Sequence, residues 1–354
     1  MTILGQTTPD KSNSSSSNPA TGELGKDLLT LETVPRQHIF RLLQIAQELK
    51  ANPQPERSSQ LLKGLTLGLI FEKPSTRTRV SFEAGMNQLG GQALFLSSEK
   101  IQLSRGESLA DTAMVLSRYL DGLVIRTFQQ STLQEWARHA TIPVINGLTD
   151  LSHPCQALAD LMTILEKKGS LKGMKLAYLG DGNNIANSLI EASAKVGMHI
   201  AVGCPPDYMP NAEIVKKSRK EANETGAVIE ITSNPEEAAR DADALYTDVW
   251  TSMGQEEEQA QRLNALFPYQ LNQAIVTVAK PDAIVLHCLP AHRGEEITEA
   301  VIDGPQSAVL DQAENRLHVQ KAILTEWLGT VSYTHLRAHE TDSYLVCRLR
   351  LEKK

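Results

Sequence analysis

The stretch Leu65-Thr-Leu-Gly-Leu-Ile-Phe-Glu-Lys-Pro-Ser-Thr-Arg-Thr-Arg79 decides the fold of the first half of the chain. Residues 65–71 read as a buried strand, and apolar residues recur at helical spacing over 80–89, with Pro74 just before the first turn. The pattern predicts a strand, a short loop and a helix at about 76–89. A strand followed in this way by a helix is typical of an α/β domain with a parallel sheet.

The start of that helix carries an unusual charge. Arg77 and Arg79 fall in its first turn, where the helix dipole already places about half a positive charge, so an anion is needed to stabilise them. The hydroxyls of Ser75, Thr76 and Thr78, the backbone N–H groups and the forked guanidinium of Arg77 match the oxygens of a phosphoryl group. The motif therefore predicts a phosphate-binding loop; the alternative is a solvated basic turn.

Strand and helix signals alternate along the whole chain and predict two doubly wound parallel α/β domains, as a length of 354 residues favours. The first domain, 25–168, has predicted strands at 65–71, 92–96, 122–126 and 142–146 and helices at about 76–89 and 107–118. The second domain, 169–314, has predicted strands at 174–180, 198–203, 227–231, 244–248 and 283–288. An active site is expected in the cleft between the domains.

Three further segments frame these domains. A helical pattern starts at Leu28 and ends near Pro53, and a helix over 153–168 is closed by Gly169 at the domain boundary. A last helix is predicted at 315–328.

The two ends of the chain lack these patterns. Residues 1–24 are rich in Ser, Thr, Asn and Gly, which predicts a disordered tail. Residues 331–354 have no amphipathic period, so we expect a non-native or unstructured extension, the alternative being a lineage-specific tail.

Composition excludes several classes of function. The net charge is −7, from 35 basic and 42 acidic residues, and no basic cluster supports nucleic-acid binding. No apolar run reaches the roughly 18 residues of a membrane span, and the N-terminus lacks the apolar core of a signal peptide, so a cytoplasmic location is expected. The cysteines lack CxxC spacing, which argues against a zinc site or a disulfide framework. We expect no metal.

Four more motifs follow the phosphate-binding loop in the chain. They are His153-Pro-Cys-Gln156, Asp181-Gly-Asn-Asn184, Asp248-Val-Trp-Thr-Ser-Met-Gly-Gln255 and His287-Cys-Leu-Pro290. With Ser75-Thr-Arg-Thr-Arg79 they stand in the order of the aspartate/ornithine carbamoyltransferase family, and the chain resembles its ornithine-specific members over about residues 25–330. The resemblance implies transfer of the carbamoyl group of carbamoyl phosphate to the δ-amine of L-ornithine, giving L-citrulline and phosphate. It implies no cofactor, a homotrimer and a last helix, 315–328, that folds back onto the first domain.

The resemblance also implies a carbamoyl phosphate site. Arg126 ends a predicted strand, where parallel sheets place ligand-binding groups. His153 and Gln156 begin a helix three positions apart, and we expect both to donate to the developing oxyanion of the carbonyl group. The full expected set is Ser75, Thr76, Arg77, Thr78, Gln102, Arg126, His153, Gln156, Cys288, Leu289 and Arg316.

The ornithine side is expected to use Asn184, Asp248, Ser252 and Met253, by the same resemblance. Asp248 ends a predicted strand, so its carboxylate could bind the α-ammonium group. Cys288 joins Arg126 and His153 as an expected catalytic residue, and two roles stay open for it: acceptor of the amine's proton, which needs a shifted thiol pKa, or pocket residue.

Two other functions remain as alternatives. A carbamoyltransferase for aspartate, putrescine or an acylated ornithine would keep the phosphate motif and change the second-domain loops. A nicotinamide-dependent dehydrogenase would use the G-x-G at Gly180 and Gly182, but Ile185 stands at the third glycine position and no acidic residue ends the next predicted strand.

Overall fold

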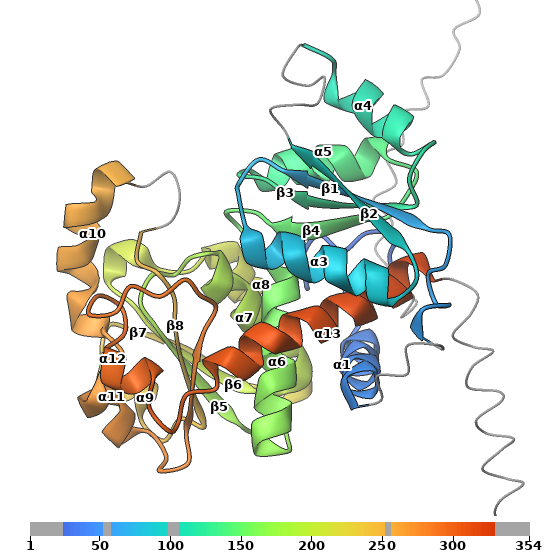
Figure 1. Ribbon diagram of the computed structural model, residues 1–354. Coiled ribbons are helices and arrows are strands. Elements are labelled where there is room, and N and C mark those ends of the chain that lie inside the picture. Colours follow the sequence, from blue (N-terminus) through green and yellow to red (C-terminus); the bar gives the residue numbers. More distant parts are fainter. Residues whose placement is uncertain (1–23, 52–57, 98–105, 252–255, 330–354) are drawn as a thin grey trace, which may run out of the picture.

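The computed structural model describes residues 24–51, 58–97, 106–251 and 256–329. The expected tails lie outside these residues, except for residue 24 at the end of the first tail. Figure 1 shows two α/β lobes joined by helices that pass between them. Within the described residues, no helix is both long and apolar enough to span a membrane.

The first sheet is parallel throughout, with strand order β2-β1-β3-β4. Its strands are β1 (Thr66–Phe71), β2 (Gln92–Ser97), β3 (Gly122–Arg126) and β4 (Val144–Leu148). Alternate residues of β3 enter different cores: Leu123 and Ile125 pack towards α4 (Leu109–Leu116) and α5 (Gln130–His139), and Val124 packs on the opposite face. On that face α3 (Thr76–Gln88) contacts β2, whereas α1 (Arg36–Ala51) packs mainly on the C-terminal helix of the chain. The predicted strands are found, with β4 displaced towards its C-terminal side.

The second sheet is also parallel, with order β7-β6-β5-β8-β9. Its strands are β5 (Lys175–Leu179), β6 (His199–Gly203), β7 (Ile229–Thr232), β8 (Ala244–Thr247) and β9 (Ile284–His287). The helices around it are α7 (Asn184–Val196), α8 (Ala212–Thr225), α9 (Pro235–Ala239), α10 (Gln259–Leu266), α11 (Gln273–Val278) and α12 (Glu299–Ile302). Two doubly wound parallel domains are therefore confirmed, whereas their exact limits stay a prediction.

Two helices connect the lobes. The helix α6 (Pro154–Lys168) is buried from Pro154 to Ile164 and ends at Gly169, whose φ of 76° is the left-handed conformation expected of a C-terminal glycine. The helix α13 (Val309–Leu328) contacts α1, α3 and α6 and also β9 (Figure 1). It begins at Val309, before the predicted start at Asn315. One buried apolar cluster consequently runs through both domains.

The N-terminal helical pattern was predicted too early. Leu28 is not helical: its N–H donates to the Val144 carbonyl at 2.9 Å, and its carbonyl accepts from the Asn146 N–H at 2.8 Å. The helix α1 begins only at Arg36. Leu28 is fully buried and lies beside β4 in an isolated parallel bridge to Ile145, and a single apolar residue in such a bridge leaves no period-2 signal in the sequence.

Candidate active site

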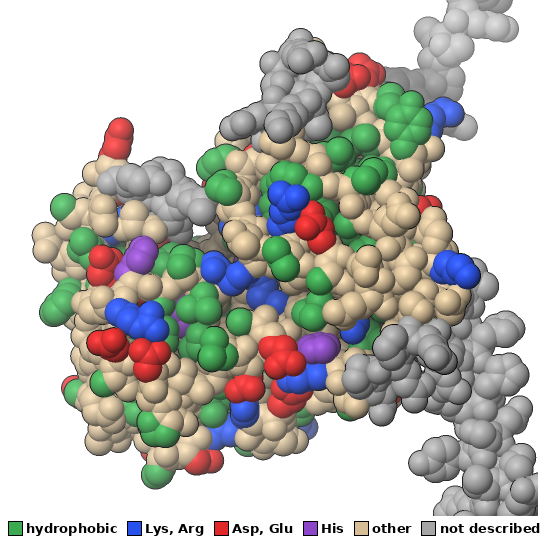
Figure 2. All heavy atoms as spheres, in the orientation of Figure 1, with side chains coloured by type: hydrophobic (Ala, Val, Ile, Leu, Met, Phe, Trp, Pro, Cys, Tyr) green, Lys and Arg blue, Asp and Glu red, His purple; other side chains and the backbone are tan. Residues whose placement is uncertain are grey.

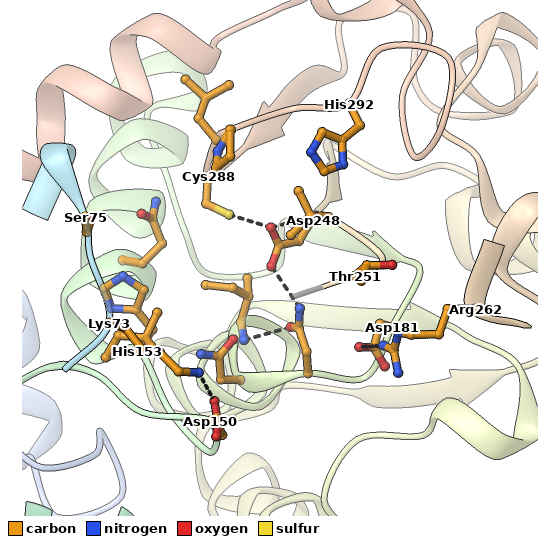
Figure 3. Close-up of a pocket in the computed structure, with 18 of the residues that line it drawn as sticks. Lys73, Ser75, Asp150, His153, Asp181, Asp248, Thr251, Arg262, Cys288 and His292 are labelled. Carbon is orange, nitrogen blue, oxygen red and sulfur yellow. Dashed lines mark hydrogen bonds and ion pairs between the residues drawn. The ribbon is translucent and has the colours of Figure 1, made fainter. Parts of the chain in front are cut away.

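A cleft of about 1240 Å³ lies between the two lobes, at the carboxyl ends of the strands. Its lining residues include Arg126 at the end of β3, Asp248 after β8 and Cys288 after β9. Figure 2 shows Lys and Arg side chains in the hollow between the lobes, and Figure 3 shows the lining residues. Parallel sheets bind ligands at this edge, as the sequence predicted.

The predicted phosphate-binding loop lies at the N-terminus of α3. Ser75 is the N-cap, and its Oγ accepts from the Thr78 N–H at 3.2 Å. Arg77 faces the cleft, whereas Arg79 points away, pairs with Glu83 at 2.9 Å and stacks on the ring of Phe95. The two arginines of the motif therefore have different environments, and only Arg77 is available to a ligand in the cleft.

Three guanidinium groups converge on the cleft. Arg77 and Arg126 are half-buried, and Arg316 is 4 % exposed. None of the three pairs with a carboxylate among the described residues. Burial, then repulsion from the other two, lowers the pKa of Arg126 to about 10, so it stays charged at neutral pH. Three unneutralised cations in one cleft favour binding of an anion.

Arg77 and Arg316 are held by neutral acceptors. Arg316 donates to Thr78 Oγ1 at 2.7 Å, across the interface of α13 and α3. Arg77 donates to the Leu289 carbonyl at 2.6 Å, so the phosphate loop of one domain touches the loop after β9 in the other. Leu289 has a φ of 59°, a conformation uncommon outside glycine, and this turn aims its carbonyl into the cleft.

His153 is the N-cap of α6 and is 3 % exposed. Burial, followed by repulsion from Arg316 and Arg126, holds its pKa well below the usual range, so the imidazole is neutral. A neutral imidazole has one N–H donor and one acceptor nitrogen, and His153 Nδ1 has no hydrogen-bond partner among the described residues. The ring can therefore donate to a ligand oxygen without bringing a further charge.

Gln156 bonds to a buried carboxylate of its own helix. Its Nε2 donates to Asp160 Oδ1 at 2.8 Å, and its Oε1, which is fully buried, has no partner among the described residues. The amide therefore has an acceptor left over, and its Nε2 keeps a second N–H, so the expected role as a donor to an oxyanion stays a prediction. Asp160, one helical turn later, decides which groups are left over, and its contact could not be read from the His153-Pro-Cys-Gln156 motif.

Asp248 and Cys288 contact each other on the second-domain side of the cleft. The Cys288 thiol donates to Asp248 Oδ1 at 2.8 Å (Figure 3), and Asp248 Oδ2 accepts from Asn183 Nδ2, also at 2.8 Å. Burial and the neighbouring Asp248 carboxylate raise the pKa of Cys288 well above its usual range. The thiol therefore keeps its proton, which does not suit a residue that must accept one.

The neighbouring asparagines have distinct roles. Asn183 caps α7, and its Oδ1 accepts from the N–H groups of Ile185 and Ala186. Asn184 lines the cleft and donates to the Thr149 carbonyl at 2.6 Å. Because Asn183 already uses the first N–H groups of α7, the place that a dinucleotide pyrophosphate would take is filled, which argues against the dehydrogenase hypothesis.

The structure thus brings most of the expected site residues together. Those lining the cleft are Ser75, Thr76, Arg77, Arg126, His153, Gln156, Asn184, Asp248, Cys288, Leu289 and Arg316, with Thr78 just behind. Gln102, Ser252 and Met253 lie outside the described residues.

The cleft also contains charged residues that the sequence analysis did not propose as site residues. Lys73 is 4 % exposed, pairs with Asp150 and lies over the Phe128 ring. The buried Arg262 pairs with Asp181 (Figure 3). Lys73 lies two residues before the phosphate-binding motif, and Asp181 is the first residue of the motif Asp181-Gly-Asn-Asn184. Their position in or next to these motifs is the one sequence signal that could have predicted their place in the cleft.

Two side-chain groups of the described residues could geometrically hold a metal ion: Asp248 with His287 and Cys288, and His292 with Glu295 and Glu296. In the first group the polar atoms already bond to protein. Cys288 donates to Asp248, and His287 Nδ1 accepts from the Leu289 N–H at 2.9 Å, with its Nε2 on Glu296 Oε1 at 3.0 Å. These bonds favour a protein-only network at this position.

Comparison with known proteins agrees with this geometry. Residues 26–166 match the carbamoyl-P binding domain of the aspartate/ornithine carbamoyltransferases, and residues 172–326 match their Asp/Orn binding domain. Ornithine carbamoyltransferase of Anoxybacillus flavithermus is 58% identical over 304 residues, which are 86% of this chain and 97% of that protein. That of Syntrophus aciditrophicus is 56% identical over 299 residues, 84% of this chain and 98% of that protein.

Solved structures show the same relationship. The ornithine carbamoyltransferase of Pyrococcus furiosus superposes with a TM-score of 0.84 at 50% identity, covering 87% of this chain and 98% of its own. That of Gloeobacter violaceus has a TM-score of 0.78 at 50% identity, covering 86% and 99%. The likeness extends over both domains, and the chain belongs to the aspartate/ornithine carbamoyltransferase family.

Proposed function

We propose that the chain is an ornithine carbamoyltransferase, which transfers the carbamoyl group of carbamoyl phosphate to the δ-amine of L-ornithine and releases L-citrulline and phosphate. Its relatives of 56% to 58% identity carry this activity in their names. The observation that carries the proposal is the convergence of Arg77, Arg126 and Arg316, without a paired carboxylate among the described residues, on a cleft between two domains. A phosphorylated substrate supplies the missing negative charge.

The phosphate group binds at the start of α3. The hydroxyls of Ser75, Thr76 and Thr78 and the guanidinium of Arg77 supply donors there, and the N–H groups of the first helical turn add the positive end of the dipole. Arg316 reaches the same place from α13 through Thr78. Gln102, from a part of the chain outside the described residues, is proposed as an additional contact by resemblance.

The carbamoyl group lies between Arg126, His153 and Gln156. Arg126 and the neutral His153 donate to its carbonyl oxygen, whose negative charge grows in the transition state, and such preorganised donors are worth a few kcal/mol each (~3). Gln156 Oε1 accepts from the carbamoyl –NH₂. The Leu289 carbonyl, aimed into the cleft, is a second acceptor for this group or for the attacking amine.

Ornithine occupies the second-domain side. Asp248 binds its α-ammonium group and Asn184 its α-carboxylate, with Ser252 and Met253 closing the site by resemblance. The neutral δ-amine attacks the carbonyl carbon, a C–N bond forms and the C–O bond to phosphate breaks. The electron pair leaves with phosphate, and phosphate also takes the surplus proton of the amine. Cys288 already holds its own proton and therefore shapes the pocket.

A homotrimer and a cytoplasmic location complete the proposal, both from the family resemblance. The direction of the reaction in the cell, biosynthetic or degradative, uses the same residues.

The experiment is an assay of citrulline formation from carbamoyl phosphate with ornithine, compared with aspartate, putrescine and an acylated ornithine. Ornithine alone should give product at high rate. Higher kcat/KM with another amine would move the assignment to a different member of the family. Calorimetric binding of NAD, with none of carbamoyl phosphate, would support the dehydrogenase instead.

A further inference from the structure

A buried chain of hydrogen bonds lies beneath Gln156 and joins β9, α13 and α6. The His287 N–H donates to Gln312 Oε1 at 2.8 Å, and Gln312 Nε2 donates to Asp160 Oδ1 at 2.7 Å. The same Asp160 oxygen accepts from Gln156 Nε2 at 2.8 Å. All four residues are at most 1 % exposed. Asp160 entered the site above only as the partner of Gln156, and Gln312 does not line the cleft.

The direction of each bond in this chain is fixed from one end. A backbone N–H can only donate, so Gln312 must turn its carbonyl oxygen to His287 and its amide nitrogen to Asp160. Asp160 must then present an acceptor. Because Gln156 donates to that same oxygen, its own Oε1 is left facing away from Asp160, unpartnered among the described residues, in a side chain that lines the cleft.

We propose that Asp160 and Gln312 are positioning residues that make the cleft select the –NH₂ of carbamoyl phosphate over a methyl group of the same shape. This inference rests on the proposed function. An acyl phosphate with a methyl group, such as acetyl phosphate, leaves Gln156 Oε1 buried without a donor. A site built to hydrogen-bond a polar group rejects the analogue that lacks it, because the polar atom of the protein stays unpaired.

The arrangement does not depend on the ionisation of Asp160. Burial raises the pKa of Asp160 to about 7, against the hydrogen bonds from Gln156 and Gln312. A proton would go to Oδ2, which has no partner among the described residues, since Oδ1 already faces two N–H donors. Oδ1 therefore accepts in both states. An asparagine, which resembles the protonated acid, should keep the same orientation as long as Gln312 faces it.

That reasoning gives a test with three nearly isosteric variants. In Asp160→Asn, Gln312 still imposes an acceptor on the substituted side chain, and in Gln312→Met, the Asp160 carboxylate can still only accept. In the double variant the Tyr246 hydroxyl, which contacts Gln312 and Asp160 in the wild type, can either donate or accept and so imposes no orientation on the introduced asparagine amide. The amide of Gln156 is then free to turn over. The readouts are KM for carbamoyl phosphate and the competitive inhibition constant of acetyl phosphate, measured at about pH 8.5, where Asp160 is ionised.

We expect the ratio of KM for carbamoyl phosphate to the inhibition constant of acetyl phosphate to stay within about threefold of wild type in both single variants. In the double variant KM for carbamoyl phosphate should rise by about tenfold or more while the inhibition constant of acetyl phosphate stays unchanged, so the ratio rises by the same factor. Asp160→Leu, which removes the acceptor in one step, should give the same selective loss and serves if the double variant does not fold.

Glu191→Gln is the matched control. Glu191 is also a buried acid, whose pKa burial raises to about 7, but it bonds to the Leu31 N–H and does not line the cleft. Both constants should stay unchanged in it. Equal weakening of both ligands in the double variant, or losses of selectivity that simply add up from the single variants, would overturn the inference. A wild-type protein that makes no citrulline would instead overturn the proposed function.

Discussion

The two ends of the cleft differ in how their polar groups are satisfied. At the first-domain end, Arg77, Arg126 and Arg316 repel one another and have no carboxylate partner among the described residues. At the second-domain end, Asp248 already accepts from both Cys288 and Asn183. A ligand at the first end relieves repulsion, whereas a ligand at the second end must exchange existing hydrogen bonds. We expect carbamoyl phosphate to gain more binding energy from the protein than ornithine does.

The largest effect is expected from Arg77→Ala. Removing a charge-assisted contact to phosphate should weaken carbamoyl phosphate by about 100-fold or more, with little change in the thermal midpoint. Arg79→Ala is the control from the same motif, because Arg79 pairs with Glu83 outside the cleft. Calorimetric affinity and thermal unfolding of both variants decide the matter, and equal affinities in the two would remove Arg77 from the phosphate site.

Asp248→Asn is expected to have a smaller effect than Arg77→Ala, and to weaken ornithine binding instead of carbamoyl phosphate binding. Loss of the carboxylate should raise KM for ornithine by about 10- to 50-fold and leave KM for carbamoyl phosphate nearly unchanged. Asp243→Asn is the control, since Asp243 lies at the other end of β8, where it pairs with Lys280. That variant should lower the thermal midpoint without changing either KM. A rise in both KM values for Asp248→Asn would show that the two ends are not separable.

The pH dependence of the two ends should also differ. The depressed pKa of His153 means that the ring is neutral in the folded state at pH 6.5 and above, so it contributes no titration to carbamoyl phosphate binding there. The free δ-amine of ornithine has a pKa near 10, and kcat/KM for ornithine should rise about tenfold per pH unit below it. Initial rates between pH 6.5 and 9 measure both the affinity for carbamoyl phosphate and kcat/KM for ornithine. The lower limit is the pKa of an unperturbed histidine, ~6.5. A step near pH 6.5 in carbamoyl phosphate affinity would contradict a neutral His153.

The smallest effect is expected from Cys288→Ser. A hydroxyl can still donate to Asp248, so we expect a change of about threefold in KM for ornithine and no movement of the pH profile. If Cys288 accepted the amine's proton, the substitution would lower kcat strongly and shift the profile. Profiles of kcat and kcat/KM for wild type and variant distinguish these outcomes.

Much of the fold was predictable because its signals are local. Residues 65–89 contain a strand, a capped helix start and a helix in one continuous stretch, and the structure has β1 and α3 there. The strand ends at Arg126, Asp248 and Cys288 were predictable for the same reason, since parallel topology brings them to one edge. The helix α5 was missed, and Leu28 was assigned to the wrong element, because an isolated bridge of one residue has no period.

The parts of the site that could not be predicted depend on contacts between distant residues. Arg316 meets Thr78 only because α13 returns to α3, so its burial has no trace in the surrounding sequence. The orientation of Gln156 depends on Asp160 and, through it, on Gln312. Motifs identify which residue types approach a ligand, but the direction in which an amide points is decided by partners outside the motif.

The helix α13 also has a consequence for how the protein is made. Val319, Ile323 and Trp327 are buried in the core that α13 shares with α1 and α3, so the N-terminal lobe receives part of its core from nearly the last residues described. A ribosome releases this lobe's strands early and its closing helix late. The strands of the second lobe and its helices α7 to α12 precede α13, and its core also uses Val309 at the start of that helix. The second lobe is therefore complete before the first, and we expect it to fold first during synthesis although it is second in the sequence.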